Sequence, residues 1–205
     1  MIEVEARKDG LWTLRLNRPD KANALTADML GQLIAAVRQA SAARALIVTG
    51  VGKVFSAGAD LDEARAGLAT SPLWEDLSSA LAALPCLKIA ALNGTLAGGA
   101  NGMALACDLR IAVPTAKVFY PVMRLGYMPQ PSDVVRMRAL IGPARTKMVL
   151  AAGQKLTAQE AYDFGLIDRI VEPDALLREA ETLAEPALGA DPDLAARILA
   201  ACDGL

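Results

Sequence analysis

Two glycine-rich segments contain the residues best suited to chemistry in this chain. The first, V-G-K-V-F-S-A-G-A-D-L-D, covers residues 51–62, and the second, L-N-G-T-L-A-G-G-A-N-G-M-A-L-A-C-D, covers residues 92–108. Each follows an apolar stretch typical of a strand and opens a helical pattern, so backbone N–H groups at the turn lack intrahelical partners. Glycine there lets a bound group approach the main chain closely. Two such turns facing each other would donate to a negatively charged oxygen, as an oxyanion hole does.

The glycine spacing of the second segment differs from that of nucleotide-binding motifs. Gly94, Gly98, Gly99 and Gly102 do not follow the G-x-G-x-x-G pattern, and the chain has no G-K-[S/T] motif. A nicotinamide-dependent reductase is therefore not expected. A single glycine-rich turn is more often ordinary turn chemistry, so the interpretation as a site depends on the two turns occurring together.

The residue types present limit the possible catalytic groups. The chain contains no histidine, which excludes Ser-His-Asp and Cys-His nucleophiles and an imidazole base. Cys86, Cys107 and Cys202 lie far apart and never in C-x-x-C spacing, so neither a metal site nor a redox pair is expected. Cys107 is interpreted as a packing residue. Proton transfer would therefore use carboxylates, tyrosine, lysine, cysteine or water.

Composition places the chain among globular proteins with a substantial core. Its 205 residues suit one domain, and 54% of them are hydrophobic. Aromatic residues make up 4% and the net charge is −2, which argues against nucleic-acid partners and a basic membrane-binding face. No apolar run approaches the roughly 20 residues that a membrane helix needs, and the charged N-terminus lacks a signal-peptide core. We expect a cytoplasmic protein that binds neither nucleic acid nor membrane.

Alternating strand and helix patterns predict an α/β fold. The expected strands cover residues 12–16, 44–49, 87–92, 108–113, 117–120 and 167–171. The expected helices cover residues 27–39 after an N-cap at Thr26, then 72–84, 99–106, 132–140 and 144–152, a helix opened by the capping box 157–160, and 174–184, broken by Pro186.

In their order along the chain, the motifs resemble those of the crotonase superfamily, the enoyl-CoA hydratases and isomerases. The matching segments are N-R-P at 17–19 with N-A-L at 23–25, the two glycine turns, L-G at 125–126 with Pro129, Arg136 and L-I-G at 140–142, and L-T-A-Q-E-A at 156–161 with G-L-I-D at 165–168. The resemblance implies a crotonase-like spiral of ββα units. It places the core domain at residues 1–172 and a shortened C-terminal helical segment at 173–205.

The resemblance also implies particular site residues. The oxyanion-hole amides fall on Ala59 and Gly99, and coenzyme A is expected as part of the substrate, with no tightly bound cofactor. Lys21 would meet a phosphate as a point charge, whereas Asp62 stands where many relatives carry lysine and would repel phosphate. The expected contacts to coenzyme A are Lys21, Ala22, Ala24, Ala57, Asp60 and Leu61. Asp60 is also interpreted as the cap of the following helix.

Both glutamates of the hydratases are missing. The resemblance places them at Gly102 and Val122, and a third acidic position used by some relatives falls on Gln130. Addition of water to a double bond needs a base and an acid, which these residues do not supply. Asp133 and Tyr127 are the speculative acid–base candidates, with Tyr120, Lys117 and Arg124 nearby. In the alternative interpretation, Asp133 caps the first turn of a helix and the tyrosines are core or rim aromatics.

Two functional hypotheses follow. The first is an enzyme, a lyase or isomerase, that stabilises the enolate of an acyl-CoA thioester in an oxyanion hole, with decarboxylase- or isomerase-like chemistry instead of standard hydration. The second is a non-catalytic subunit that binds acyl-CoA or serves in assembly. The resemblance also implies a homo-oligomer, a trimer or hexamer, although the C-terminal helices that build it in relatives are shortened here.

Overall fold

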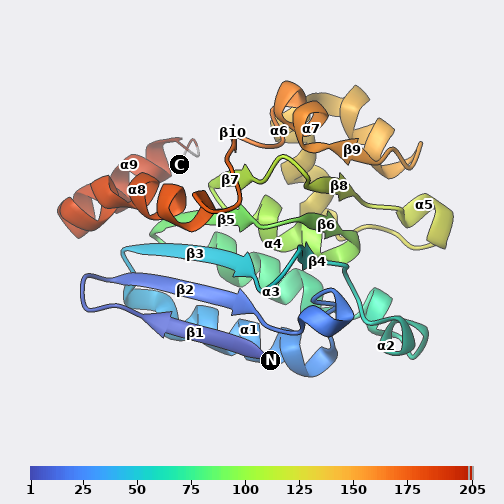
Figure 1. Ribbon diagram of the computed structural model, residues 1–205, viewed down its shortest axis with the longest axis horizontal. Helices are drawn as coiled ribbons and strands as arrows, with labels where there is room; N and C mark the ends of the chain where they lie inside the picture. The colour runs from blue at the N-terminus through green and yellow to red at the C-terminus, as the bar shows by residue number, and fades with distance from the viewer. Residues whose placement is uncertain (203, 205) are drawn as a thin grey trace.

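The computed structural model describes residues 1–202 and 204 and contains two sheets (Figure 1). The larger has the strand order β1-β2-β3-β5-β7-β10 and the smaller the order β4-β6-β8-β9. The strands of the larger sheet are β1 (Ile2–Ala6), β2 (Leu11–Leu16), β3 (Ala45–Gly50), β5 (Leu87–Leu92), β7 (Leu109–Ala112) and β10 (Arg169–Ile170). Those of the smaller are β4 (Val54–Ser56), β6 (Thr95–Ala97), β8 (Lys117–Phe119) and β9 (Leu156–Thr157).

Helices cover the sheets and connect their strands. The α-helices are α1 (Ala27–Gln39), α2 (Leu61–Arg65), α3 (Leu73–Ala82), α4 (Asn101–Leu105), α5 (Val122–Leu125), α6 (Pro131–Leu150), α7 (Ala158–Phe164), α8 (Leu176–Gly189) and α9 (Pro192–Cys202). Short 3₁₀ turns are η1 (Pro19–Lys21), η2 (Ala40–Ala42), η3 (Leu68–Thr70) and η4 (Gly98–Ala100). In Figure 1, α8 crosses in front of the larger sheet, whereas α1 and α3 lie behind it.

The chain winds through repeated ββα units. A buried strand of the larger sheet leads into a short strand of the smaller sheet and then into a helix, as in β3–β4–α2, β5–β6–α4 and β7–β8–α5. β3, β5 and β7 pair in parallel, and so do β4, β6 and β8. Parallel pairing brings equivalent turns to the same edge of the sheet. The predicted crotonase-like α/β spiral is therefore confirmed.

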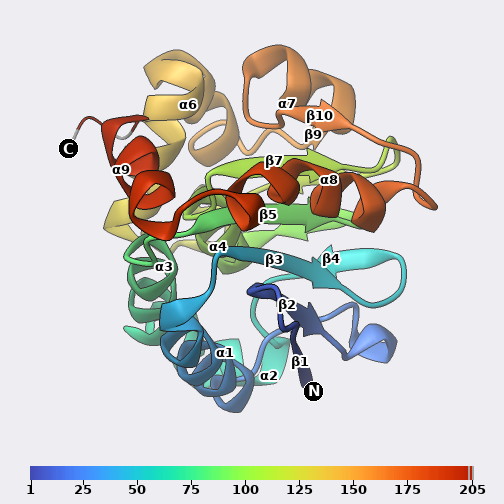
Figure 2. The same ribbon diagram turned by 90° about the vertical axis from the view of Figure 1, so that its left-hand side faces the viewer.

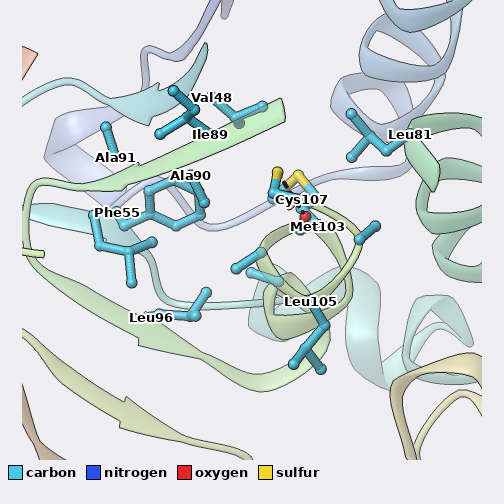
Figure 3. Packing of buried hydrophobic residues seen from close by; sticks show 14 of the residues in the cluster. Val48, Phe55, Leu81, Ile89, Ala90, Ala91, Leu96, Met103, Leu105 and Cys107 are labelled. Carbon is cyan, nitrogen blue, oxygen red and sulfur yellow. Dashed lines mark hydrogen bonds between the residues drawn. The ribbon is translucent and has the colours of Figure 1, made fainter. Parts of the chain in front are cut away.

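The core lies between these layers because the central strands are apolar on both faces. Every residue of β3 except the last is buried, and so is every residue of β5 except the first, as expected for parallel strands covered on both sides. Figure 3 shows Ile89 and Ala90 of β5 in this core with Phe55, Met103 and Cys107. Burial raises the pKa of the Cys107 thiol to about 12, which confirms its interpretation as a packing residue.

Local sequence signals place the helix starts correctly. Thr26 Oγ1 accepts a hydrogen bond from Met29 N at 3.1 Å at the start of α1. Thr157 and Glu160 form the predicted capping box of α7. The two helices expected after residue 132 are the two halves of α6, because Gly142 interrupts the helix with φ +76° and ψ 168°.

Two expectations at the ends of the chain differ from the structure. α8 does not break at Pro186 but continues to Gly189. Pro186 lies in its last turn, and the buried residues Leu176, Ala180 and Ala184 hold the helix against the larger sheet (Figure 2). Packing therefore outweighs the lost N–H of proline. β1 was not expected, because its charged side chains obscure an edge strand that pairs with β2.

Candidate active site

The first glycine turn packs directly against the second. Ala59 bridges to Leu25: Leu25 N donates to Gly58 O at 2.7 Å, and Asp60 N donates to Leu25 O at 2.8 Å. Gly58 has φ +90°, and a Cβ there would lie 2.9 Å from Ala97 O. A larger residue at this position would push the two turns apart, so glycine sets their close approach.

The second turn places a glycine amide beside a fixed tryptophan. Gly99 lies in η4 just before α4, and a Cβ on it would lie 2.9 Å from the ring of Trp74. Trp74 Nε1 donates to Leu68 O at 2.7 Å, which holds the ring in place. Within the described part of the chain, neither Ala59 N nor Gly99 N donates a hydrogen bond to another group. Both sequence-predicted amides are thus free to bind a ligand.

A pocket of about 150 Å³ lies between these turns. Its wall includes Ala59 and Gly99, together with side chains from α2, α3, α5 and the loop that precedes α6. The more polar lining residues are Tyr120, Tyr127 and Gln130, and no lining residue carries a charge. α2 and α5 lie beyond the smaller sheet, at the right of Figure 1. The pocket therefore offers backbone donors within an uncharged wall.

The loop between β2 and α1 is locked to the first turn. Ala57 N donates to Ala22 O at 3.0 Å, and Arg18 Nη1 donates to Ala24 O at 3.0 Å. Lys21 is exposed at the outer side of this loop. The structure thus brings Ala22, Ala24 and Ala57 together at the first turn, with Lys21 exposed on the same loop.

Asp60 and Leu61 differ in their availability for a ligand. Asp60 Oδ1 accepts from Asp62 N at 3.1 Å, and Oδ2 accepts from Arg18 at 2.7 Å. The hydrogen bond from Asp62 N confirms that Asp60 caps the following helix. The Arg18 guanidinium lowers the pKa of Asp60 below its usual value. Leu61 is 74% exposed and lines the pocket. A hydrophobic side chain this exposed beside a pocket is available for a ligand.

The structure separates the two acid–base candidates. Tyr127 lines the pocket and is 38% exposed. Asp133 is fully buried in the first turn of α6, and it is not a pocket-lining residue. Its Oδ2 accepts from Tyr120 Oη at 3.1 Å, and its Oδ1 has no hydrogen-bond partner among the described residues. Asp133 thus lies in the first turn of α6, as the alternative interpretation expected, but within the described residues its carboxyl caps no backbone amide.

The residue opposite Asp133 is Gly102. A Cβ at Gly102 would lie 2.9 Å from Asp133 Oδ1, so the carboxyl occupies the space that a side chain at position 102 would need. Burial raises the pKa of Asp133 to about 7. Burial and the neighbouring Asp133 also raise the pKa of Tyr120. Sequence reasoning missed the contact between Gly102 and Asp133. No local motif links these residues, because the packing of α4 against α6 brings them together.

Residues 1–202 and 204 contain neither a cluster of metal-ligating side chains nor a helix able to cross a membrane. No group of three or more Cys, Asp or Glu side chains could hold a metal ion there. No helix among these residues is both long and apolar enough to cross a bilayer.

Comparisons with known proteins agree with the fold. The family model described as "Enoyl-CoA hydratase/isomerase" matches residues 6–203. YngF of Bacillus subtilis, assigned by name to the enoyl-CoA hydratases/isomerases, is 39% identical over 96% of this chain and 78% of its own length. A crotonyl-CoA hydratase of Syntrophomonas wolfei is 34% identical over 87% of this chain and 72% of its own. The crystal structure of an enoyl-CoA hydratase from Bacillus anthracis aligns with a TM-score of 0.88 at 31% identity, over 95% of this chain and 79% of that one.

The ββα spiral, with a pocket between two strand-to-helix turns, defines an α/β protein of the crotonase fold. The chain belongs to the enoyl-CoA hydratase/isomerase family of the crotonase superfamily.

Proposed function

We propose that this chain binds an acyl-CoA thioester in the pocket and polarises its carbonyl with the N–H groups of Ala59 and Gly99. Both residues line the pocket, and neither N–H donates a hydrogen bond within the described part of the chain. The turns that present them are in close contact through Gly58 and Ala97. Fixed donors in a site that excludes water stabilise the negative charge of an enolate oxygen.

The coenzyme A portion is assigned to the loop that holds Lys21. This loop lies beside the pocket and is bonded to the first turn through Ala22 and Ala57. Lys21 supplies a positive charge for a phosphate. Leu61, exposed at the pocket mouth, supplies apolar contact for the rest of the ligand.

The reaction that fits this pocket best is loss of CO₂ from a β-carboxy thioester. The electron pair of the breaking C–C bond moves onto the thioester carbonyl, and the two amides stabilise the enolate that forms. The uncharged wall carries this proposal, because it does not repel the substrate carboxylate and does not supply the base that hydration needs. Isomerisation is the second reaction to examine, since it also proceeds through an enolate.

We expect purified protein to release CO₂ from malonyl-CoA or methylmalonyl-CoA, measured by trapping labelled CO₂. Val122→Glu should lower this rate about tenfold or more, because a carboxylate in the wall repels the substrate carboxylate. Val122 lines the pocket and is 7% exposed. Val122→Gln has nearly the same shape without the charge and is the matched control.

Release of CO₂ from neither substrate contradicts the decarboxylase assignment. Calorimetry with acyl-CoA then distinguishes what remains. Binding without turnover of any thioester in a panel supports the non-catalytic binding or assembly subunit. Absence of binding at millimolar acyl-CoA contradicts the assignment of the pocket itself.

A further inference from the structure

We propose that Tyr120, supported by the buried carboxyl of Asp133, exchanges a proton with the α-carbon of the bound thioester. This inference rests on the thioester-binding part of the proposed function. Tyr120 is the group that meets the substrate, and Asp133 is a positioning and proton-holding residue behind it.

The placement of the two side chains carries the inference. Tyr120 lines the pocket, and its hydroxyl donates to Asp133 Oδ2 at 3.1 Å. Tyr120 is 4% exposed and Asp133 0% exposed, so bulk water does not separate them. A pocket-lining tyrosine that is hydrogen-bonded to a buried carboxyl has a partner with which it can exchange a proton.

The absence of a side chain at Gly102 leaves the space that the carboxyl of Asp133 occupies. Because Gly102 has no side chain, Asp133 Oδ1 fills the adjacent space, 2.9 Å from where a Cβ would stand. That oxygen is buried and has no partner in the described part of the chain. A buried carboxyl oxygen without a partner costs free energy. A role in proton transfer gives this buried acid a function.

The charged surroundings of Asp133 allow both protonation states. Burial, the largest effect, raises its pKa to about 7, while the hydrogen bond from Tyr120 and the charge of Arg136 oppose this rise. Glu75 on α3 raises the pKa further. Arg136 is held by Ser132 at 3.0 Å, and Ser132 in turn donates to Glu75 at 2.9 Å. The pair is therefore bordered by a fixed polar network.

The proton step conserves atoms and charge. In the forward direction the enolate α-carbon takes the proton of Tyr120 Oη, forming a C–H bond and breaking the O–H bond. In this direction Asp133 starts as the neutral acid, with its Oδ2–H donating to Tyr120 Oη. Tyr120 Oη takes this proton as it gives up its own, and the resulting carboxylate is reprotonated from water. In reverse, the α-carbon gives a proton to Tyr120 as Tyr120 gives its own to ionised Asp133.

The reverse step supplies a test that does not depend on decarboxylation. Propionyl-CoA, which has no carboxyl group to lose, is incubated with the protein in D₂O, and α-deuterium incorporation is followed by NMR. Wild-type protein should exchange the α-protons, and Tyr120→Phe should slow exchange by about 10²-fold or more. Tyr162→Phe is the control, because Tyr162 lies on α7 outside the pocket and is 47% exposed.

The role of Asp133 is read from the pH profile. Exchange by the wild type should rise with pH through an inflection near 7, because the carboxylate must be ionised to accept the proton. Asp133→Asn, which keeps the shape of the side chain, should slow exchange and remove that inflection. Thermal unfolding of each variant shows whether it is folded.

The outcomes separate this inference from the proposed reaction. Any of three results overturns the assignment of Tyr120. These are no α-proton exchange by the wild type, exchange at the wild-type rate by folded Tyr120→Phe, and loss of exchange only in Tyr127→Phe. An unchanged inflection in Asp133→Asn overturns the assignment of Asp133. CO₂ release without α-proton exchange leaves the decarboxylase proposal intact, and exchange without CO₂ release leaves the present inference intact.

Discussion

Crotonyl-CoA incubated with the wild-type protein should be hydrated at a rate near the uncatalysed background. Hydration needs one group to activate water and another to protonate the α-carbon, and each contributes about 10²–10⁴-fold. The family resemblance places both groups at Gly102 and Val122, which have no ionisable side chain. Tyr120 can supply the proton for the α-carbon, but none of the described residues that line the pocket carries a charge that could activate water. The loss of absorbance of the crotonyl double bond measures the rate.

Restoring hydration should require three substitutions. Gly102→Glu alone places its Cβ 2.9 Å from Asp133 Oδ1 and sets two carboxyl groups against each other. Asp133→Gly removes that conflict and opens the space. We expect Gly102→Glu with Val122→Glu and Asp133→Gly to hydrate crotonyl-CoA about 10²-fold or more faster than wild type.

The matched control for this experiment carries Gln instead of Glu at position 102, with the same two other substitutions. It has the same bulk without the acid and should remain near background. Brisk hydration by the wild-type protein would contradict the account, because acid and base groups would then have to lie elsewhere in the pocket.

Arg110→Met should lower the free energy of unfolding by about 3–5 kcal/mol. Arg110 is 3% exposed, and its guanidinium donates to Cys107 O at 2.7 Å, Leu166 O at 3.0 Å and Asp168 Oδ2 at 3.1 Å. It thereby joins the end of α4 to the turn that leads into β10. Methionine preserves much of the volume but removes these side-chain donors, and Asp168 Oδ2 keeps only the hydrogen bond from the backbone N–H of residue 110.

Chemical denaturation measures the effect of Arg110→Met. Arg65→Met is the control, because Arg65 is 77% exposed in its ion pair with Asp62, and its loss should cost less than about 1 kcal/mol. Equal stability of the two variants would show that Arg110 does not hold the α4 and β10 regions together.

Local signals in the sequence predicted most elements correctly. The apolar runs at 44–49 and 87–92 are buried strands, and Thr26 and Thr157 cap the helices expected of them. These features depend on neighbouring residues, so a single sequence contains them. The end of α8 beyond Pro186 depends on packing against the larger sheet, which no local pattern records.

In the candidate site, too, some residues could be predicted from the sequence and others only from the packing. Resemblance to a family located Ala59 and Gly99, and the structure places both at one pocket. It could not locate the pairing of Tyr120 with Asp133, because 13 residues and a change of direction between β8 and α6 separate them. The sequence pattern suggested Tyr127 and Asp133 as acid–base candidates, with a helix cap as the alternative for Asp133, since exposure and hydrogen-bond partners become visible only once α6 is packed.

The most direct test of the central claim is a crystal structure with a bound acyl-CoA thioester. The account predicts that the thioester oxygen lies about 2.7–3.1 Å from both Ala59 N and Gly99 N, the distance expected of oxyanion-hole donors. The acyl chain should then lie in the pocket beside Tyr120 and Val122. A thioester oxygen directed away from either amide, or a ligand bound outside this pocket, would contradict the account.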